Sequence, residues 1–111
     1  KKQVRIVASR SHQNQDTRDF INQYDNTELV SMGSSLKFMV LAEGNADVYP
    51  RYAPTMEWDT AAGQAILAAV GGSLIDLETR MPLDYGKINR RNGNFLAFRA
   101  PYKISDFNLL T

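Results

Sequence analysis

The sequence predicts an α/β domain in which helices cover a mixed or mainly parallel sheet of five strands. Apolar, β-branched runs of strand length alternate with segments whose apolar residues recur at helical spacing, and the loops between them are short. The chain has 111 residues, of which 43% are hydrophobic. That length suffices for one domain with a buried core, so we expect residues 1–111 to form a single domain.

Composition excludes several classes of function. Thirteen Lys and Arg balance twelve Asp and Glu, which leaves a formal net charge of +1 and argues against a nucleic acid polymer as partner. The chain has no Cys and one His, so disulfides and zinc sites with several Cys or His ligands are excluded. No apolar run is long enough for an integral membrane span. Because the net charge is close to zero, any anion site must depend on a local group of polar or positively charged residues.

The first half of the chain alternates strands and helices. We expect strands at 4–8, 27–32 and 46–49, each rich in apolar or β-branched residues. Residues 15–24 are expected to form a helix with Phe20, Ile21 and Tyr24 on one face. A second helix, over residues 36–43, is apolar almost all round, which predicts that it is mostly buried.

The second half centres on the stretch Trp58-Asp59-Thr60-Ala61-Ala62-Gly63. Asp59 is a favoured type of N-cap residue, and Gly71-Gly72 supplies a stop, so a helix is expected between them. Strands are expected at 73–77 and 94–98, with a turn-rich connection from 78 to 93. The buried face of the helix is expected to comprise Ala61, Ala62, Ala65, Ile66, Ala69 and Val70.

Polar residues follow three of the expected strands, where open α/β sheets bind their ligands. These loops are Ser9-Arg10-Ser11-His12, Gly33-Ser34-Ser35 with Lys37, and Arg51 through Asp59. The free N–H groups of a helix start at Gly33, Ser34 and Ser35 favour an anion. Lys37 lies in the first helical turn, where the helix dipole disfavours a cation unless an anion is present.

Each of these residues also has a purely structural interpretation. Ser34 or Ser35 can cap the helix while Lys37 extends to solvent. Arg51 suits a bidentate phosphate contact, although an exposed Arg after a strand is common. His12, as a single His, is as well explained by a hydrogen bond within a loop. For Asp59, capping of the helix would by itself explain the residue.

The ordered motifs together resemble a known family. They are Ser9-Arg10-Ser11-His12, Gly33-Ser34-Ser35-Leu36-Lys37-Phe38, Ala42-Glu43-Gly44, Asp47-Val48-Tyr49-Pro50-Arg51 and Trp58-Asp59-Thr60-Ala61-Ala62-Gly63. The chain is similar to the C-terminal half of the inositol-monophosphatase-like, magnesium-dependent phosphatases. Within them it most resembles the bacterial 3′(2′),5′-bisphosphate nucleotidases. The similarity extends to Pro82-Leu83-Asp84-Tyr85.

The resemblance implies roles for particular residues. Asp59 is implied to be a catalytic ligand of Mg²⁺ beside the scissile phosphate. His12, Ser34, Lys37 and Arg51, together with Gly33 of the same segment, are implied to line the nucleotide pocket. Two cations, Lys37 and Arg51, fit the second phosphate of adenosine 3′,5′-bisphosphate better than a polyol.

The same resemblance implies that this chain is incomplete as an enzyme. The Glu-Glu pair and the Asp-Pro-(Leu/Ile)-Asp-Gly-Thr segment, which supply most metal ligands in the family, do not occur in these residues. We therefore expect a C-terminal, nucleotide-binding domain that is inactive alone, with a missing N-terminal domain as its partner. The parent enzyme is expected in the cytoplasm or peripherally at the inner membrane. Two alternatives stay open: a non-catalytic nucleotide- or anion-binding module, and an inositol-phosphate phosphatase.

Overall fold

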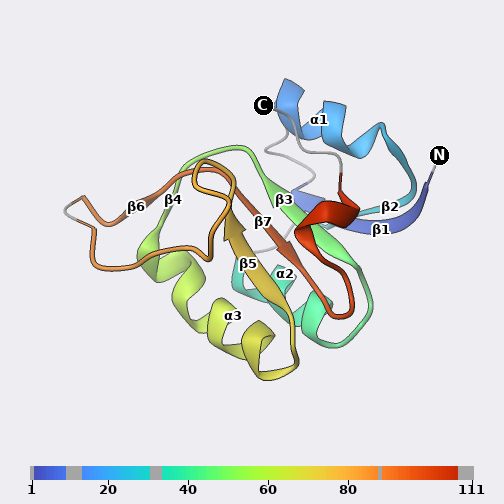
Figure 1. The fold of residues 1–111 in the computed structure, drawn as a ribbon. Helices are drawn as coiled ribbons and strands as arrows, with labels where there is room; N and C mark the ends of the chain where they lie inside the picture. The colour runs from blue at the N-terminus through green and yellow to red at the C-terminus, as the bar shows by residue number, and fades with distance from the viewer. Residues whose placement is uncertain (1, 10–13, 31–33, 88, 108–111) are drawn as a thin grey trace.

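A computed structural model describes residues 2–9, 14–30, 34–87 and 89–107, and it has an α/β architecture (Figure 1). The helices are α1 (Gln15–Ile21), α2 (Ser34–Ala42) and α3 (Glu57–Ala69), and a short 3-10 helix is η1 (Ile104–Asp106). The strands are β1 (Lys2–Ser9), β2 (Tyr24–Val30), β3 (Val48–Arg51), β4 (Thr55–Met56), β5 (Ser73–Asp76), β6 (Arg91–Asn92) and β7 (Phe95–Phe98).

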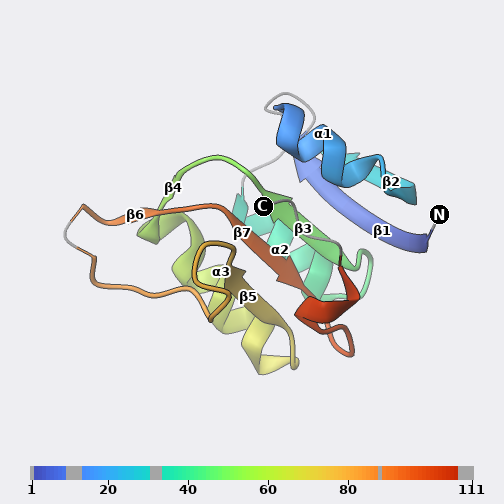
Figure 2. The same ribbon diagram turned by 45° about the horizontal axis from the view of Figure 1, so that its top comes forward.

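The main sheet has five strands in the order β2-β1-β3-β7-β5. Strand β1 is parallel to β2 and β3, whereas β7 is antiparallel to β3 and β5, so the sheet is mixed. Helices α2 and α3 cover one face, and α1 and η1 lie on the other (Figures 1 and 2). This arrangement confirms the predicted five-stranded α/β fold. Strands β4 and β6 form a separate antiparallel pair beside the start of α3.

Alternation along the strands divides the core between the two faces. In β7, Leu96 and Phe98 belong to the cluster under α1 and η1, while Phe95 and Ala97 belong to the cluster under α2 and α3. On the second face the rings of Phe38, Tyr49 and Phe95 meet with centroids 5.5 to 6.0 Å apart. These aromatic contacts join α2 to the centre of the sheet.

Helix α1 is shorter than the sequence predicts. It ends at Ile21, and Tyr24 begins β2, where it pairs with Lys2 of β1. The expected helix over 15–24 and the expected start of a strand at residue 27 were therefore wrong. The centroid of the Tyr24 ring still lies 5.2 Å from that of the Phe20 ring, so the two residues predicted to share a helix face lie side by side although Tyr24 belongs to a strand. Apolar spacing alone did not distinguish these two backbones.

The predicted buried face of α3 is also wrong. Buried side chains on this helix are Glu57, Thr60 and Leu67, and Gly63 packs against α2. Exposed instead are Ala61, Ala62, Ala65, Ile66, Ala69 and Val70. Because Ala, Gly and Thr are small, the pattern is apolar on both faces and does not say which one meets the sheet.

Helix α2 is buried on one side only. Phe38 and Leu41 are fully buried, but Leu36 is 53% and Met39 is 38% exposed. The prediction that this helix is mostly buried thus holds only for the side that faces the sheet. In the part of the chain that the structure describes, no helix is both long and apolar enough to cross a membrane.

Candidate functional site

Asp59 lies in the first turn of α3, as predicted, but it does not cap the helix. Met56 occupies the N-cap position, and Asp59 is the third helical residue. The Met56 N–H donates a hydrogen bond of 2.8 Å to Asp59 Oδ2. The Asp59 side chain thus binds backward to the strand that leads into the helix, as the acidic residue of a capping box does. The residue is exposed, which leaves its carboxylate accessible to a ligand.

Glu57 begins α3 as a nearly buried carboxylate. It accepts hydrogen bonds from the Gly86 N–H at 3.1 Å and the Lys87 N–H at 3.0 Å, and the Lys87 ammonium lies 3.1 Å away. The hydrogen bond from the Lys87 N–H, followed by those from Gly86 and the Lys87 ammonium, lowers the pKa of Glu57 to about 2 against the opposing effect of burial. Glu57 is therefore ionised at neutral pH and fastens residues 86–87 to the helix start.

Beneath this ion pair lies a buried polar cluster. The Asn92 side-chain amide donates to Thr55 Oγ1 at 3.1 Å, Met56 O at 3.1 Å and Thr60 Oγ1 at 3.0 Å. The Tyr85 hydroxyl also donates to Thr60 Oγ1, at 3.1 Å. Asn92 and Thr60 are 1% and 0% exposed, so these bonds form away from water, where an unpaired amide would be costly. These hydrogen bonds hold the connection from 84 to 92 against the first turn of α3.

Two cations meet on the face of the sheet that α2 covers. Lys37 of α2 is only 2% exposed, and its ammonium lies 5.4 Å from the centroid of the Tyr49 ring. Arg51 stands two residues beyond Tyr49 in β3 and so projects from the same face. Burial, and then the charge of Arg51, lowers the pKa of Lys37. The alternative interpretation, in which Lys37 extends to solvent, is therefore wrong.

Arg51 carries an unsatisfied donor beside this lysine. Its Nε atom is buried and has no hydrogen-bond partner among the described residues. A buried guanidinium N–H without an acceptor is unfavourable, as is the approach of two like charges. An anion placed between Lys37 and Arg51 would relieve both costs.

The structure brings together only some of the predicted site residues. Lys37 and Arg51 are neighbours, and Asp59 lies at the start of the adjacent helix α3. His12 and Gly33 lie outside the described residues. Ser34 is the first residue of α2, but its side chain is not described. The roles assigned to these residues by the sequence stay predictions.

Sequence reasoning missed the contribution of the 78–93 connection. It expected turns there, whereas Lys87 and Asn92 contact the first turn of α3 and residues 91–92 form a strand. The only local signal is the carboxylate of Glu57 in that first turn, which also suits the helix dipole without any partner. A partner 30 residues away cannot be inferred from that pattern.

The described residues do not form a metal centre by themselves. Among them no group of three or more His, Asp or Glu side chains is arranged to hold a metal ion. Asp16, Asp19 and Glu78 are exposed and belong to no such group. Asp59 offers the kind of oxygen ligand that Mg²⁺ takes, but only one such residue.

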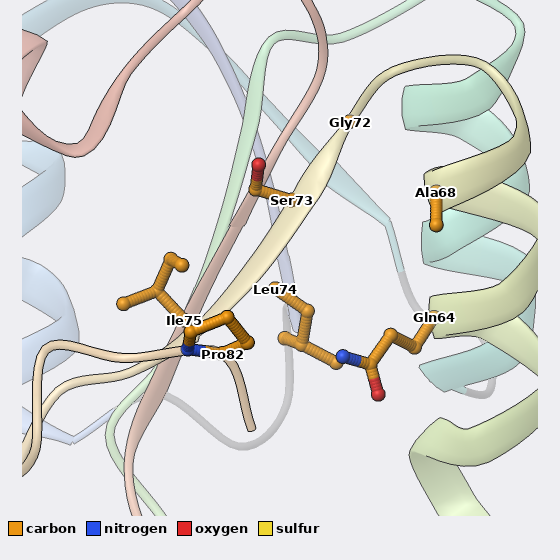
Figure 3. Close-up of a pocket in the computed structure, with 7 residues that line it drawn as sticks. All are labelled: Gln64, Ala68, Gly72, Ser73, Leu74, Ile75 and Pro82. Carbon is orange, nitrogen blue, oxygen red and sulfur yellow. The ribbon is translucent and has the colours of Figure 1, made fainter. Parts of the chain in front are cut away.

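A cavity of about 210 Å³ lies between the C-terminal half of α3 and β5. Figure 3 shows Gln64 and Ala68 facing it from the helix, with Leu74, Ile75 and Pro82 on the opposite side. Gly72 and Ser73 complete its lining, in which there is no charged side chain. This cavity is therefore unsuited to a phosphate, in contrast to the region of Lys37 and Arg51.

Comparison with known proteins places these features in a family. Residues 1–102 match the model of the inositol monophosphatase family. The chain belongs to this family. Relatives include the 3′(2′),5′-bisphosphate nucleotidase CysQ of Escherichia coli K12, 46% identical over 80 residues that make up 72% of this chain and 32% of that protein. A shorter relative, an uncharacterised protein in the pss 5′ region of Rhizobium leguminosarum bv. phaseoli, is 56% identical over 67% of this chain and 83% of its own length.

A solved structure supports the same assignment of fold. CysQ from Bacteroides thetaiotaomicron, described as a bacterial member of the inositol monophosphatase family, superposes with a TM-score of 0.78 at 43% identity. The superposition covers 92% of this chain and 39% of that one. The chain thus spans about one third of the CysQ relative from Escherichia coli and somewhat more of this structure.

Proposed function

We propose that this chain is the nucleotide-binding portion of a magnesium-dependent 3′(2′),5′-bisphosphate nucleotidase, which hydrolyses 3′-phosphoadenosine 5′-phosphate to AMP and phosphate. The observation that carries the proposal is the neighbouring pair of cations, buried Lys37 and half-buried Arg51, with the buried and unsatisfied Nε donor of Arg51. A substrate with two phosphates offers an acceptor for the unsatisfied Arg51 Nε donor and negative charge beside two neighbouring cations. Identity to CysQ supports the same substrate class. We propose the cytoplasm as the compartment of this reaction.

Asp59 is proposed as one ligand of the catalytic Mg²⁺. Its Oδ2 accepts the Met56 N–H, which orients the carboxylate, while the exposed side chain is open to an ion. When bound, magnesium ions polarise the phosphoryl group and lower the pKa of an attacking water. The remaining ligands have to come from outside the described residues, since these contain no cluster able to hold the ion alone.

The proposed source of those ligands is the part of the family fold that has no counterpart in this chain. The match covers 32% of the Escherichia coli relative, so two thirds of that protein lie outside it. The outer face of α3 offers a place for such a partner. Between Thr60 and Val70 this helix has no charged side chain, and Ile66 and Val70 are 40% and 52% exposed. An uncharged helix face of this kind is typical of a surface that another layer covers.

Calorimetric titration with adenosine 3′,5′-bisphosphate, with and without Mg²⁺, tests the proposal on this chain. We expect weak binding that depends on Lys37 and Arg51, and no appreciable release of phosphate by the chain alone. Tight binding without metal would instead favour the non-catalytic anion-binding module. Robust magnesium-dependent phosphate release by the chain alone would contradict the requirement for outside ligands.

Substitutions in an enzyme that contains the complete family fold separate the roles further. Asp59→Asn is expected to abolish turnover. Lys37→Met or Arg51→Gln is expected to reduce kcat/KM for the bisphosphate more than for AMP-like monophosphates. Equal losses on both substrates would refute the assignment of these cations to the second phosphate.

A further inference from the structure

The geometry points to Lys87 as a positioning residue for the Asp59 carboxylate, acting through Asn92 and the backbone at Met56. Lys87 lies in the connection between β5 and β6, 28 residues after Asp59 in the sequence. The functional consequence rests on the proposed role of Asp59, whereas the positioning itself is a property of this chain.

The first step is the complete use of the Lys87 ammonium. Its Nζ donates to Glu57 Oε2 at 3.1 Å, to Asn92 Oδ1 at 3.1 Å and to the carbonyl oxygen of Asp84. An ammonium has three N–H donors and no acceptor, so these three contacts satisfy it. Lys87 therefore bridges two side chains, one on α3 and one on β6, in a single geometry.

The second step is the orientation of Asn92. Because an ammonium only donates, the Asn92 atom that faces Lys87 has to be the oxygen, and the amide nitrogen then faces the opposite way. That nitrogen lies 3.1 Å from Thr55 Oγ1 and 3.1 Å from the Met56 carbonyl oxygen. The Met56 carbonyl oxygen, which only accepts, requires the same orientation, so Lys87 fixes the oxygen end of the buried Asn92 while its nitrogen end meets the strand that leads into α3.

The third step is the transfer to Asp59. Asn92 holds Thr55 and Met56, and the peptide unit between these two residues carries the Met56 N–H. That N–H donates to Asp59 Oδ2 at 2.8 Å. Asp59 is exposed, so packing does little to restrict its rotamer and this hydrogen bond is its principal restraint. A displaced Met56 N–H would leave the carboxylate free to sample other rotamers.

The test measures the Asp59 rotamer in the full chain by NMR, from the three-bond couplings that report its χ1 angle, together with hydrogen exchange at the Met56 amide. The variant is Lys87→Met, which removes the ammonium and keeps the length of the side chain. Glu57→Gln is a second variant. It keeps one side-chain oxygen, so that one of the two backbone N–H groups retains its acceptor, and it removes the charge that holds Lys87 in place.

Arg99 provides a matched control. Its side chain is 28% exposed, against 31% for Lys87, and it pairs with the buried Asp47 as Lys87 pairs with Glu57. Both cations also lie over a tyrosine ring, Tyr102 at 5.4 Å and Tyr85 at 5.6 Å. Arg99→Met should therefore cost comparable stability. Arg99 directly follows β7, whereas Asn92 precedes that strand, and among the described residues Arg99 has no contact with Met56 or Asn92.

The expected result is one dominant Asp59 rotamer in the parent chain and in Arg99→Met, with averaging among rotamers in Lys87→Met and Glu57→Gln. Exchange at the Met56 amide should become roughly tenfold faster in these two variants. An unchanged Asp59 rotamer in Lys87→Met would overturn the inference, as would equal averaging in Arg99→Met at the same loss of stability. Because no readout requires turnover, this result is independent of whether the proposed reaction is correct.

Discussion

Gly63 allows α3 to lie close against α2, and the Gly63→Ala substitution tests how tightly that contact is packed. A Cβ atom added at Gly63 would lie 2.3 Å from Cδ2, 2.6 Å from Cγ and 3.0 Å from Cβ of Phe38. Phe38 is fully buried, and its ring packs against Tyr49 and Phe95. The ring therefore has little room to move, and its Cβ moves only with the backbone of α2.

Two opposing effects set the magnitude. Replacing Gly by Ala inside a helix favours folding by about 1 kcal/mol through helix propensity. Forcing a methyl group into a packed core costs about 1 to 3 kcal/mol, and contacts as short as these lie at or above the upper end. We expect a net loss of ~2 kcal/mol in the free energy of unfolding. For a chain of 111 residues that corresponds to a fall in Tm of roughly 8 °C.

Urea and thermal unfolding, followed by circular dichroism, measure this loss, and a double-mutant cycle identifies its cause. Phe38→Ala removes Cγ and Cδ2, the two atoms nearest to the added methyl group, and alone is expected to cost about 3 to 5 kcal/mol. Combined with Gly63→Ala it should relieve most of the clash, so that the double variant loses less stability than the two single losses added together. A Gly63→Ala variant as stable as the parent, or strict additivity in the cycle, would refute the close contact between α3 and α2.

Three further predictions follow from other parts of the molecule. Asp47 is bound by Arg5 and Arg99, and although its burial acts to raise its pKa, these hydrogen bonds lower the pKa below the ordinary 3.8. The stability that the Asp47 carboxylate contributes is present above the ordinary pKa and is lost as the pH falls through the folded pKa. In urea titrations, the difference in free energy of unfolding between the parent chain and Asp47→Asn should therefore shrink below about pH 4 and stay constant between pH 5 and 8. Ile66→Ser with Val70→Ser should reduce binding of a hydrophobic dye, whereas Met81→Ser, at a 62% exposed site in the connection between β5 and β6, should not. An equal reduction would contradict a continuous apolar face on α3. Trp58, the single Trp, is 68% exposed, so its fluorescence emission in this chain should have the wavelength of a tryptophan in water. The emission should shift to shorter wavelength when the rest of the family fold is added. An unchanged spectrum in a formed complex would exclude docking at the start of α3.

The sequence predicted the sheet well because strand signals are local. Runs such as 4–8 and 94–98 are apolar, β-branched or aromatic, and each forms a strand within one or two residues of its expected bounds. Helix ends were predicted where a backbone requirement marks them. Helix α3 ends at Ala69, and Gly71 follows with φ of +82°, a conformation that favours glycine.

The face of α3 was not predictable in the same way. Its residues are apolar or small all round the helix, so the hydrophobic pattern contains two candidate faces. The sheet meets the side that carries Leu67, a large aliphatic residue. Thr60 and Gly63 precede Leu67 on the same side at helical spacing. Choosing that side requires knowledge of Phe38, which fills the space opposite Gly63 from another helix.

The candidate site was predicted only in its local parts. Lys37 was singled out because it stands in the first turn of a helix, where a cation opposes the dipole. Asp59, in the first turn of α3, was interpreted locally as a cap, and its role as a metal ligand came from the family resemblance and stays a prediction. The partners of that turn, Lys87 and Asn92, come from a connection that has no regular pattern. Their contribution arises from tertiary hydrogen bonds over about 30 residues of sequence, which no periodicity records.

Helix α3 carries two features that are usually separate, an uncharged outer face and an accessible carboxylate. Trp58 and Asp59 occupy its first turn, and Ile66 and Val70 lie toward its other end, so the exposed apolar side chains begin beside the carboxylate. Under the proposed function, a layer that packs on this face also comes within reach of Asp59. Covering the helix and completing the metal site would then be one event, since the ligands that Asp59 lacks would arrive with the surface that excludes water from the helix. The buried contacts of Glu57 and Asn92 keep that first turn in place on the sheet side, so under the proposed function the helix would present a preformed half of the site.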